Sequence, residues 1–366
     1  MSDDLIFQLS LQRVPYIGHV HAKILSQLFG SAKAIFSASK SELGRIEGIG
    51  EVRAKSIKEF SSFKLAEKEI SFIEKYKINP LFLTDKNYPR RLLNCYDPPT
   101  MLYYKGNADL NVGKIIAIVG TRNNTDYGRQ VTEKLIKDLA AHDILIISGL
   151  AFGIDSIAHR TALKHGLATV GVLGHGLDTI YPSDNTHLAK LMIKNGGLLT
   201  EFPSNTKPDK HNFPSRNRVV AGISDATVLV ETGIKGGSMI TGEMAYSYNR
   251  DVFSVPGKIT DTKSAGCNYL IRSNKAILLT EANELLEIMG WVKNNTETPK
   301  PQREMFPELS PDETLLLNIL KEKESTTIDE LNMVSGLSSS AVAAAILKLE
   351  LESIIKSLPG KLYKLV

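Results

Sequence analysis

The sequence has few of the residues and motifs that define several classes of protein. Its 366 residues include only two cysteines, Cys95 and Cys267, so it has neither a disulfide framework nor a CxxC zinc motif. No run of about 18 apolar residues occurs, which argues against a transmembrane helix. The first residues, MSDDLIFQLS, are acidic where a secretory signal would be basic. We therefore expect a cytoplasmic protein with reduced thiols.

The motifs of common enzymes are also missing. Each Gly-Lys pair is followed by Ile or Leu, so there is no P-loop, and neither GxSxG nor HExxH occurs. No cluster of acidic residues indicates a two-metal nuclease. Asp155 and His159 lie four residues apart and His175 follows in a later loop, but this spacing matches no known metal signature. We predict no catalytic residue, no metal and no cofactor.

The charge of the chain is nearly balanced, with 44 basic and 40 acidic residues and a net charge of +4. That excess is too small to indicate a polyanionic partner by itself. Its distribution is uneven, because residues 306–366 hold six lysines against nine acidic side chains. The basic excess therefore lies in the first two thirds of the chain.

Residues 1–80 have the apolar spacing of short helices that end at glycines. Within them, IEGIGEVRAKSI (46–57) is typical of a helix-hairpin-helix, in which Gly48 and Gly50 form a tight turn that can approach a phosphate. Arg53 and Lys55 follow this turn. An αα-hairpin with a purely structural glycine turn is the alternative. We expect an all-α domain that adds contacts to duplex DNA without being the main site.

Residues 81–291 alternate between short apolar runs and helix-length segments. The alternation predicts a parallel sheet covered on both faces, the doubly wound Rossmann-like α/β class. The expected strands are residues 115–120, 144–149, 168–174, 197–203, 226–231, 252–257 and 276–280.

The C-terminal part begins with a segment, 292–308, that lacks apolar periodicity and holds three prolines, so we interpret it as a linker. Residues 309–366 then give three helical patterns, with caps expected at Ser310 and Asp312 and at Ser338–Ser340. Two short strands follow about a Pro-Gly turn at 359–360. Three helices followed by a hairpin are the order of a winged-helix domain.

Glycines gather after several expected strands, where the ligand site of such a sheet should lie. The glycines give sharp turns, and the helix starts behind them offer amides to an anion. Arg122 adds a planar donor group, and Asp155 is expected to cap the helix that follows Gly153. The residues expected to bind single-stranded DNA in these loops are Gly120, Thr121, Arg122, Gly149, Gly153, Gly236, Gly237 and Ser238.

The segment KPDKHNFPSRNR, residues 207–218, surrounds one aromatic residue with basic residues. Basic groups that follow a phosphate backbone and an aromatic face for a base are what single-stranded nucleic acid requires. We assign Arg218 to a structural ion pair with a carboxylate such as Glu231 or Asp225. The expected DNA-binding residues here are Lys207, Lys210, Phe213, Arg216 and Asn217. Arg122, Lys210 and Phe213 are expected to line one pocket.

The motifs AIVGTRNNTDYG, SGLAFGIDSIAH, FPSRNRVVAGISDATVLVE and GGSMITGEMA together resemble the DNA-processing family DprA, also called Smf. The resemblance covers about residues 80–290. It implies a homodimer that binds single-stranded DNA, protects incoming DNA and helps to load the RecA recombinase during natural transformation. It also implies that Arg122, Lys210 and Phe213 contact DNA.

Two other functions remain open from the residues. The loop GGSMITGE is similar to the GGxGTxxE loop of nucleotide phosphoribohydrolases, in which Glu243 would be the counterpart of a catalytic glutamate. A sequence-specific regulator acting through the winged helix is the third possibility, and the acidity of residues 306–366 weakens it. We expect that C-terminal domain to contact protein rather than DNA.

Overall fold

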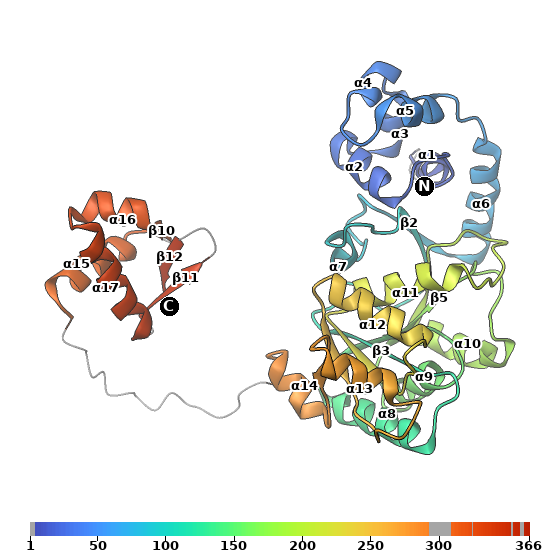
Figure 1. Cartoon of the computed structure of the whole chain (residues 1–366). Coiled ribbons are helices and arrows are strands. Elements are labelled where there is room, and N and C mark those ends of the chain that lie inside the picture. The colour runs from blue at the N-terminus through green and yellow to red at the C-terminus, as the bar shows by residue number, and fades with distance from the viewer. Residues whose placement is uncertain (1–3, 293–308, 324, 353, 359–361) are drawn as a thin grey trace. The chain divides into compact units, whose positions relative to one another are not determined.

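The computed structural model describes residues 4–292, 309–323, 325–352, 354–358 and 362–366. The chain divides into two compact units, Met1–Val292 and Lys293–Val366, each considered by itself (Figure 1). The expected linker lies outside the described residues, apart from Val292.

The first unit begins with six helices. The turn between α4 and α5 places Gly48 and Gly50 at φ +81° and +63°, in the left-handed region that favours glycine. Ala54 and Ile57 of α5 point inward and are at most 1% exposed, as the helix-hairpin-helix pattern predicts. The helices are α1 (Leu5–Leu11), α2 (His19–Phe29), α3 (Ala32–Ser37), α4 (Lys40–Gly44), α5 (Gly50–Lys58) and α6 (Phe63–Tyr76).

These helices share one continuous apolar core with the sheet that follows. Polar contacts also join the two parts. The Gln12 amide donates to the Glu201 carbonyl at 2.8 Å, and the Lys23 ammonium donates to the carbonyls of Leu93 and Cys95 at 2.7 Å. The helical part is therefore packed against the sheet rather than tethered to it.

The sheet has nine strands in the order β1-β2-β6-β5-β4-β3-β7-β8-β9. All seven expected strands are present and pair in parallel, while β1 and β2, which were not predicted, add an antiparallel edge. The strands are β1 (Asn79–Phe82), β2 (Met101–Gly106), β3 (Ile115–Gly120), β4 (Leu145–Ser148), β5 (Thr169–Leu173), β6 (Gly196–Thr200), β7 (Ala226–Val230), β8 (Asp251–Ser254) and β9 (Ile277–Leu278).

Helices cover both faces of the sheet, as the doubly wound prediction requires (Figure 1). Alternate residues of β3 show this, because Ile115 and Ala117 pack with α11, α12 and α13, whereas Ile116 and Ile118 pack with α8, α9 and α14. The helices are α7 (Arg90–Leu93), α8 (Asp126–Leu139), α9 (Ile154–Lys164), α10 (Thr186–Lys194), α11 (Asn212–Ile223), α12 (Gly237–Ser247), α13 (Ala265–Arg272) and α14 (Ala282–Ile288).

Strand order reverses between β3 and β7. From β3 the chain proceeds outward on one side through β4, β5 and β6, and then returns to place β7 on the other side of β3. The loops after β3 and β7 therefore diverge and leave a crevice at the carboxyl ends of these two strands. We therefore expect a ligand site of this sheet to lie in this crevice.

The second unit has the winged-helix order that its sequence predicts. Its helices enclose a small core that includes Leu316, Leu331, Val342 and Ile355. Ser310 and Ser338 cap the first and third helices as expected, whereas Asp312 lies in the first turn of the first helix and does not cap it. The Pro-Gly turn lies outside the described residues. The elements are α15 (Pro311–Lys321), β10 (Thr326–Thr327), α16 (Ile328–Ser335), α17 (Ser339–Leu351), β11 (Ile355–Leu358) and β12 (Leu362–Leu365).

In the part of the chain that the structure describes, no single helix is long and apolar enough to cross a membrane. The bent pair α16 and α17, at 118° to each other, reaches that length and composition only when both are taken together.

Candidate nucleic-acid interface

An open cleft lies at the β3/β7 switch point. The loops after β3, β4 and β7 and the first turns of α11 form its walls. Of the thirteen residues expected to bind single-stranded DNA, the cleft is lined by Gly120, Thr121, Arg122, Phe213, Arg216, Asn217, Gly236, Gly237 and Ser238. Loops that are more than 100 residues apart in sequence thus meet at one edge of the sheet.

Gly149 and Gly153 do not line the cleft, and each has a packing role instead. A Cβ on Gly149 would lie 1.6 Å from Nη1 of Arg216, so this glycine leaves room for the guanidinium. A Cβ on Gly153 would lie 2.2 Å from the Thr121 carbonyl. Both glycines allow close approach within the protein, which is a different reason from the phosphate contact that the sequence indicated.

Lys207 and Lys210 are exposed on the segment that leads into α11. The expectation that one pocket contains Arg122, Lys210 and Phe213 holds for Arg122 and Phe213, but Lys210 is not among the lining residues. It lies three residues before Phe213 in the sequence and is exposed. Contact of either lysine with DNA remains a prediction.

The two glycine loops nearest the crevice differ in what they offer to an anion. At the start of α8 the carboxylate of Glu231 accepts the Thr125 amide at 2.8 Å and the Thr125 hydroxyl. The anion at this helix start is therefore the Glu231 carboxylate of the protein itself, a side chain that is 2% exposed. This helix start is not free to bind an external anion.

The start of α12 is open by comparison. Its N-cap residue is Gly236, which provides no side-chain cap. Among the described residues, no hydrogen bond joins the amides of Gly237 and Ser238 to another group of the chain. Because both residues line the cleft, the first turn of α12 presents backbone donors and the positive end of its dipole to whatever enters.

Arg216 supplies a buried positive charge to the cleft, although only 9% of its side chain is exposed. Its Nη1 lies 3.7 Å from the Asp155 carboxylate, beyond hydrogen-bond distance, and its Nε has no partner among the described residues. Burial lowers the pKa of Arg216 and raises that of Asp155, while each partly offsets the shift of the other. The guanidinium is thus under-compensated and favours a further anion beside it.

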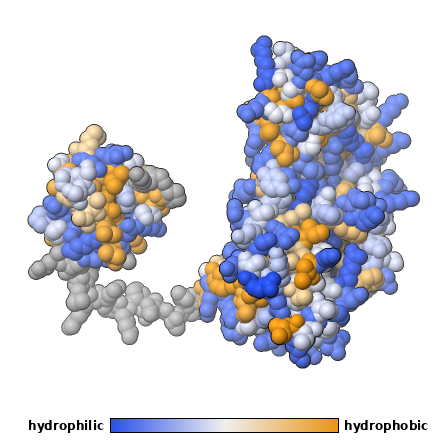
Figure 2. Space-filling view, viewed as in Figure 1, coloured by the Kyte–Doolittle hydropathy of each residue, from blue (hydrophilic) through white to orange (hydrophobic). Residues whose placement is uncertain are grey.

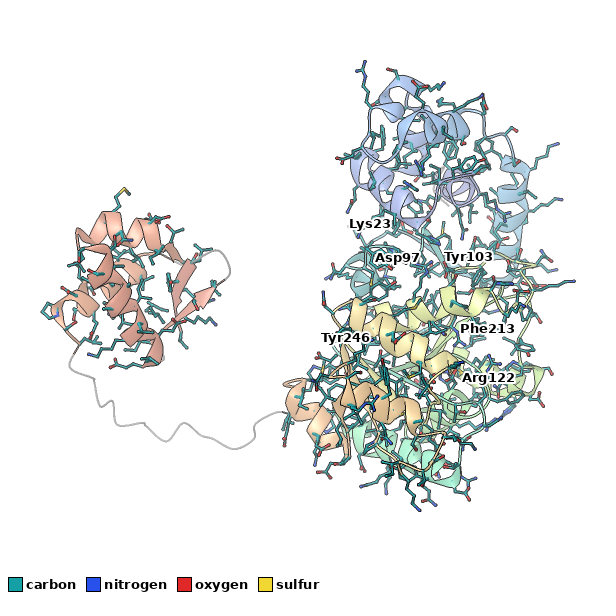
Figure 3. The ribbon with its side chains drawn as sticks, viewed as in Figure 1. Lys23, Asp97, Tyr103, Arg122, Phe213 and Tyr246 are labelled. Carbon is teal, nitrogen blue, oxygen red and sulfur yellow. The ribbon has the colours of Figure 1, made fainter. Side chains whose placement is uncertain are left out.

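Arg122 is exposed, and its guanidinium carbon lies 5.2 Å from the centre of the Phe213 ring (Figure 3). The guanidinium of Arg216 lies 5.9 Å from the same ring, and Gly174 leaves room for the ring edge. Two cations thus flank one aromatic side chain, a combination that suits a phosphate next to a base.

Arg218 has the structural role that was assigned to it. It pairs with Glu201, and its Nη1 lies 3.8 Å from the Asp97 carboxylate. The partners differ from those expected, since Asp225 binds Arg91 and Glu231 accepts hydrogen bonds from Thr125, the N-cap residue of α8. The Arg218 pair lies beneath the N-terminal helices, where His19 Nε2 is 3.3 Å from the Glu201 carboxylate.

Two of the residues considered as metal ligands in the sequence, Asp155 and His159, have other partners in the structure. Both ring nitrogens of His159 lie within hydrogen-bond distance of Thr169 and Gly149. Asp155 does not cap α9, whose N-cap is Gly153, and instead faces Arg216. Within the described ranges, no three His, Cys, Asp or Glu side chains are grouped so as to hold a metal ion.

Glu243, the residue on which the enzyme alternative depends, is not among the residues that line the cleft. It is half exposed on α12, and its carboxylate lies 3.6 Å from the Lys275 ammonium. The similarity of its loop to a hydrolase motif is therefore not matched by a position at the site.

In the helix-hairpin-helix, Arg53 and Lys55 differ in their surroundings. The Arg53 guanidinium donates to the backbone carbonyls of Tyr16 and Ile49, at 3.2 and 3.4 Å, and thereby joins the loop before α2 to the Gly48–Gly50 turn. Lys55 is exposed, 3.7 Å from Glu59. Lys55 is thus the more available of the two for a phosphate.

Sequence reasoning missed several residues of the site. Phe152 and Tyr181 are about half exposed and line a second cavity that contacts Phe213, and His175 lies at its base. The aromatic residues in SGLAFGID and DTIYPSD were the available signal. Their convergence depends on which strands are neighbours, which the motifs do not state.

Three models of known protein families match this chain. Residues 79–290 match the model of DNA recombination-mediator protein A, residues 5–69 match a helix-hairpin-helix motif, and residues 298–361 match the DprA winged helix domain. The chain belongs to the DprA/Smf family. Protein Smf of Synechocystis sp. is similar to this chain over nearly its full length, with 33% identity over 98% of both chains.

Two solved DprA structures resemble this one. DNA processing protein A from Streptococcus pneumoniae superposes with a TM-score of 0.67 at 31% identity, over 78% of this chain and 98% of that one. DNA processing protein A from Helicobacter pylori, solved to describe its single-stranded DNA binding mode, gives a TM-score of 0.53 at 30% identity, over 58% and 95%. The DprA assignment thus rests on both sequence and fold.

Proposed function

We propose that the cleft at the β3/β7 switch point binds single-stranded DNA, with the backbone held by Arg122, Arg216 and the first turn of α12. The observation that carries this proposal is the buried Arg216, whose charge is only partly compensated by Asp155 at 3.7 Å. A phosphate in the cleft would complete its environment. Membership of the DprA family and the DNA-binding relative from Helicobacter pylori support the same ligand.

Lys207 and Lys210 would extend the phosphate track at the rim, and Phe213 would stack on a base. We infer no catalytic step, because the cleft offers an anion site and an aromatic face rather than a positioned nucleophile and base. Incubation with nucleoside monophosphates should release no free base. Release that is lost in Glu243→Ala would instead support the hydrolase alternative.

The central test is the salt dependence of oligo(dT) binding, measured by fluorescence anisotropy. Arg122→Ala should weaken binding and reduce the slope of log K against log salt by ~0.7, the contribution of one phosphate on a single strand. Arg129→Ala is the matched control, since Arg129 is also exposed but pairs with Asp126 on α8, 2.6 Å away. An unchanged slope in folded Arg122→Ala would remove this residue from the site.

At the level of the pathway, we propose that this protein is a cytoplasmic recombination mediator that acts as a homodimer during natural transformation. Bound along incoming single strands, it would shield them from nucleases and help to load RecA. Its two free cysteines are buried, which suits a reducing compartment.

The mediator role is tested by RecA-driven strand exchange on DNA coated with a single-strand-binding protein. Wild type should shorten the lag before exchange, and Arg122→Ala should not. A lag that wild type leaves unchanged would limit the function to DNA binding.

A further inference from the structure

One residue holds both ends of the Arg122 loop, residues 121–125. Glu231 directly follows β7, and its carbonyl accepts the Thr121 amide at 2.7 Å. Its carboxylate accepts the Thr125 amide at 2.8 Å and the Thr125 hydroxyl. Arg122 lies between these two anchors, and its side chain is exposed. The backbone that directs the Arg122 guanidinium is therefore held by the end of β7.

Glu231 makes these contacts in a conformation that side chains seldom adopt. Its φ is +52°, in the left-handed region, and its side chain is 2% exposed. Gly128 leaves room for the carboxylate, since a Cβ there would lie 2.3 Å from Glu231 Oε2. The helix α8 does not need this acid as a cap, because the Thr125 hydroxyl already accepts the Gly128 amide at 3.2 Å. A strained residue of this kind is typical of functional sites.

Thr232, the next residue, holds the first turn of α12. Its hydroxyl accepts a hydrogen bond from the Ser238 hydroxyl at 2.7 Å and donates to the Gly233 carbonyl at 3.2 Å. Its own carbonyl accepts the Gly266 amide at 2.8 Å. Ser238 belongs to the first turn of α12 and lines the cleft. Thr232 thus joins that turn to the end of β7.

We propose that Glu231 and Thr232 are positioning residues of the cleft. Glu231 sets the Arg122 loop and Thr232 sets the first turn of α12, so two consecutive residues fix the groups that receive the DNA backbone from two sides. This proposal rests on the single-strand binding proposed above and specifies how its phosphate contacts are held in place.

The sign of the effect separates position from charge. A negative charge beside a phosphate site repels the ligand, so on electrostatic grounds removal of the Glu231 carboxylate should tighten DNA binding. If the carboxylate acts by holding the loop, its removal should weaken binding instead. Glu231→Gly is the appropriate variant, because glycine adopts φ +52° without strain and retains the carbonyl that binds Thr121.

The test is a double-mutant cycle on oligo(dT) binding by the full chain, measured by anisotropy over a series of salt concentrations. Glu231→Gly should weaken binding roughly tenfold and lower the salt slope by most of the ~0.7 that Arg122→Ala removes. In the Arg122→Ala background the same change should cost less than about twofold, because the residue through which it acts is gone. Thr232→Val should weaken binding in both backgrounds, since it acts through α12.

Further variants separate positioning from a loss of stability. Thr132→Ala removes a buried hydrogen bond of the same helix, from the Thr132 hydroxyl to the Gly128 carbonyl at 2.7 Å. It should lower thermal stability and leave oligo(dT) binding unchanged. Glu231→Gln keeps a carbonyl oxygen for Thr125 and should bind within about threefold of wild type. Thr125→Val removes only the hydroxyl contact and repeats the cycle if Glu231→Gly does not fold.

The outcomes distinguish the two proposals. If wild type does not bind oligo(dT), single-strand binding itself fails. If Arg122→Ala weakens binding but Glu231→Gly binds at least as tightly as wild type, the positioning role is wrong while the site stands. Equal losses from Glu231→Gly in the two backgrounds would also overturn it, because the carboxylate would then act independently of Arg122. Thr232→Val with the affinity of wild type would remove Thr232 from the proposal.

Discussion

At the scale of single residues, Arg216 and Asp155 connect the proposed DNA binding to the stability of the fold. Both side chains are buried and sit 3.7 Å apart, so neither charge is fully compensated. Removing the arginine leaves a buried carboxylate alone, whereas removing both charges leaves an apolar contact. The two consequences can therefore be separated by mutation.

We predict that Arg216→Met lowers the free energy of unfolding by about 3–5 kcal/mol, and that Arg216→Met with Asp155→Leu recovers most of that loss. Neither variant should bind oligo(dT) normally, because both lack the guanidinium. Urea denaturation and anisotropy provide the two measurements. A double variant that regains both stability and binding would show that Arg216 is only a structural residue.

The same residues show what the sequence can and cannot reveal. Basic and aromatic residues around Phe213 predicted a single-strand site, and the cleft brings most of them together. The motif did not reveal that Arg216 is buried against Asp155, which belongs to another loop. Arg216 and Asp155 are 61 residues apart in the sequence, and the order of the strands brings them together. The local spacing of residues does not predict this contact.

At the scale of elements, the helix starts decide which glycine loop serves a ligand. Every glycine turn after a strand looked like an anion loop, because turn chemistry is local. Glu231 occupies one of these starts from 106 residues away, at the end of β7. Within the described residues, the start of α12 keeps the amides of Gly237 and Ser238 without a partner in the cleft, so we infer that this helix start is the one that serves a ligand.

This leads to a prediction for the first residue of α12. Gly236 has φ −74° and ψ 150°, the extended backbone that a following proline requires, and a Cβ on Gly237 would meet open space. Gly237→Pro should therefore keep the helix while deleting one amide donor. Binding to oligo(dT) should fall roughly tenfold with little change in thermal stability, the loss expected for one hydrogen bond to a charged group.

Gly237→Ala is the matched control for this proline variant, since it adds a side chain and retains the N–H. It should bind like wild type. Equal losses in both variants would mean that the added atoms obstruct the cleft and that the amide is not a ligand.

The helix-hairpin-helix is the second element with a testable role. Lys55 is exposed beside the Gly48–Gly50 turn, while Arg53 is held by internal carbonyls. Lys55→Ala should weaken duplex binding and leave oligo(dT) binding intact, because it removes one phosphate contact from this element alone. Lys33→Ala on α3, also exposed, is the control. Duplex affinities that match wild type would favour the structural hairpin.

At the scale of the whole molecule, the order of domains and the seven parallel strands followed from apolar periodicity. The polar junction between the N-terminal helices and the sheet did not. His19, Glu201 and Arg218 come from distant segments and meet only in the fold. A chain that began near residue 80 would lose His19 from this network and uncover the apolar core, so point variants test the N-terminal helices better than truncation does.

In the described part of the acidic winged-helix unit, the helix that this fold places on DNA carries few basic side chains. Its third helix, α17, would lie in a major groove and read bases with polar or basic side chains. Its outward residues Ala343, Ala344, Leu347 and Leu351 are instead apolar and exposed, and Figure 2 shows an apolar stripe on this unit. Lys348, the helix's sole basic residue, lies 3.1 Å from the Glu313 carboxylate.

We therefore predict that a chain ending at Val292 binds duplex and single-stranded DNA with the affinity and salt slope of the full chain. The physical reason is that phosphates repel the acidic unit, whose exposed apolar helix face suits a protein contact. Leu347→Glu with Leu351→Glu in the full chain is the companion variant, and it should change neither DNA affinity. A truncated chain with weaker duplex binding and a smaller salt slope would instead make this unit a second DNA site, with Lys356 and Lys364 of its hairpin as the residues to mutate next.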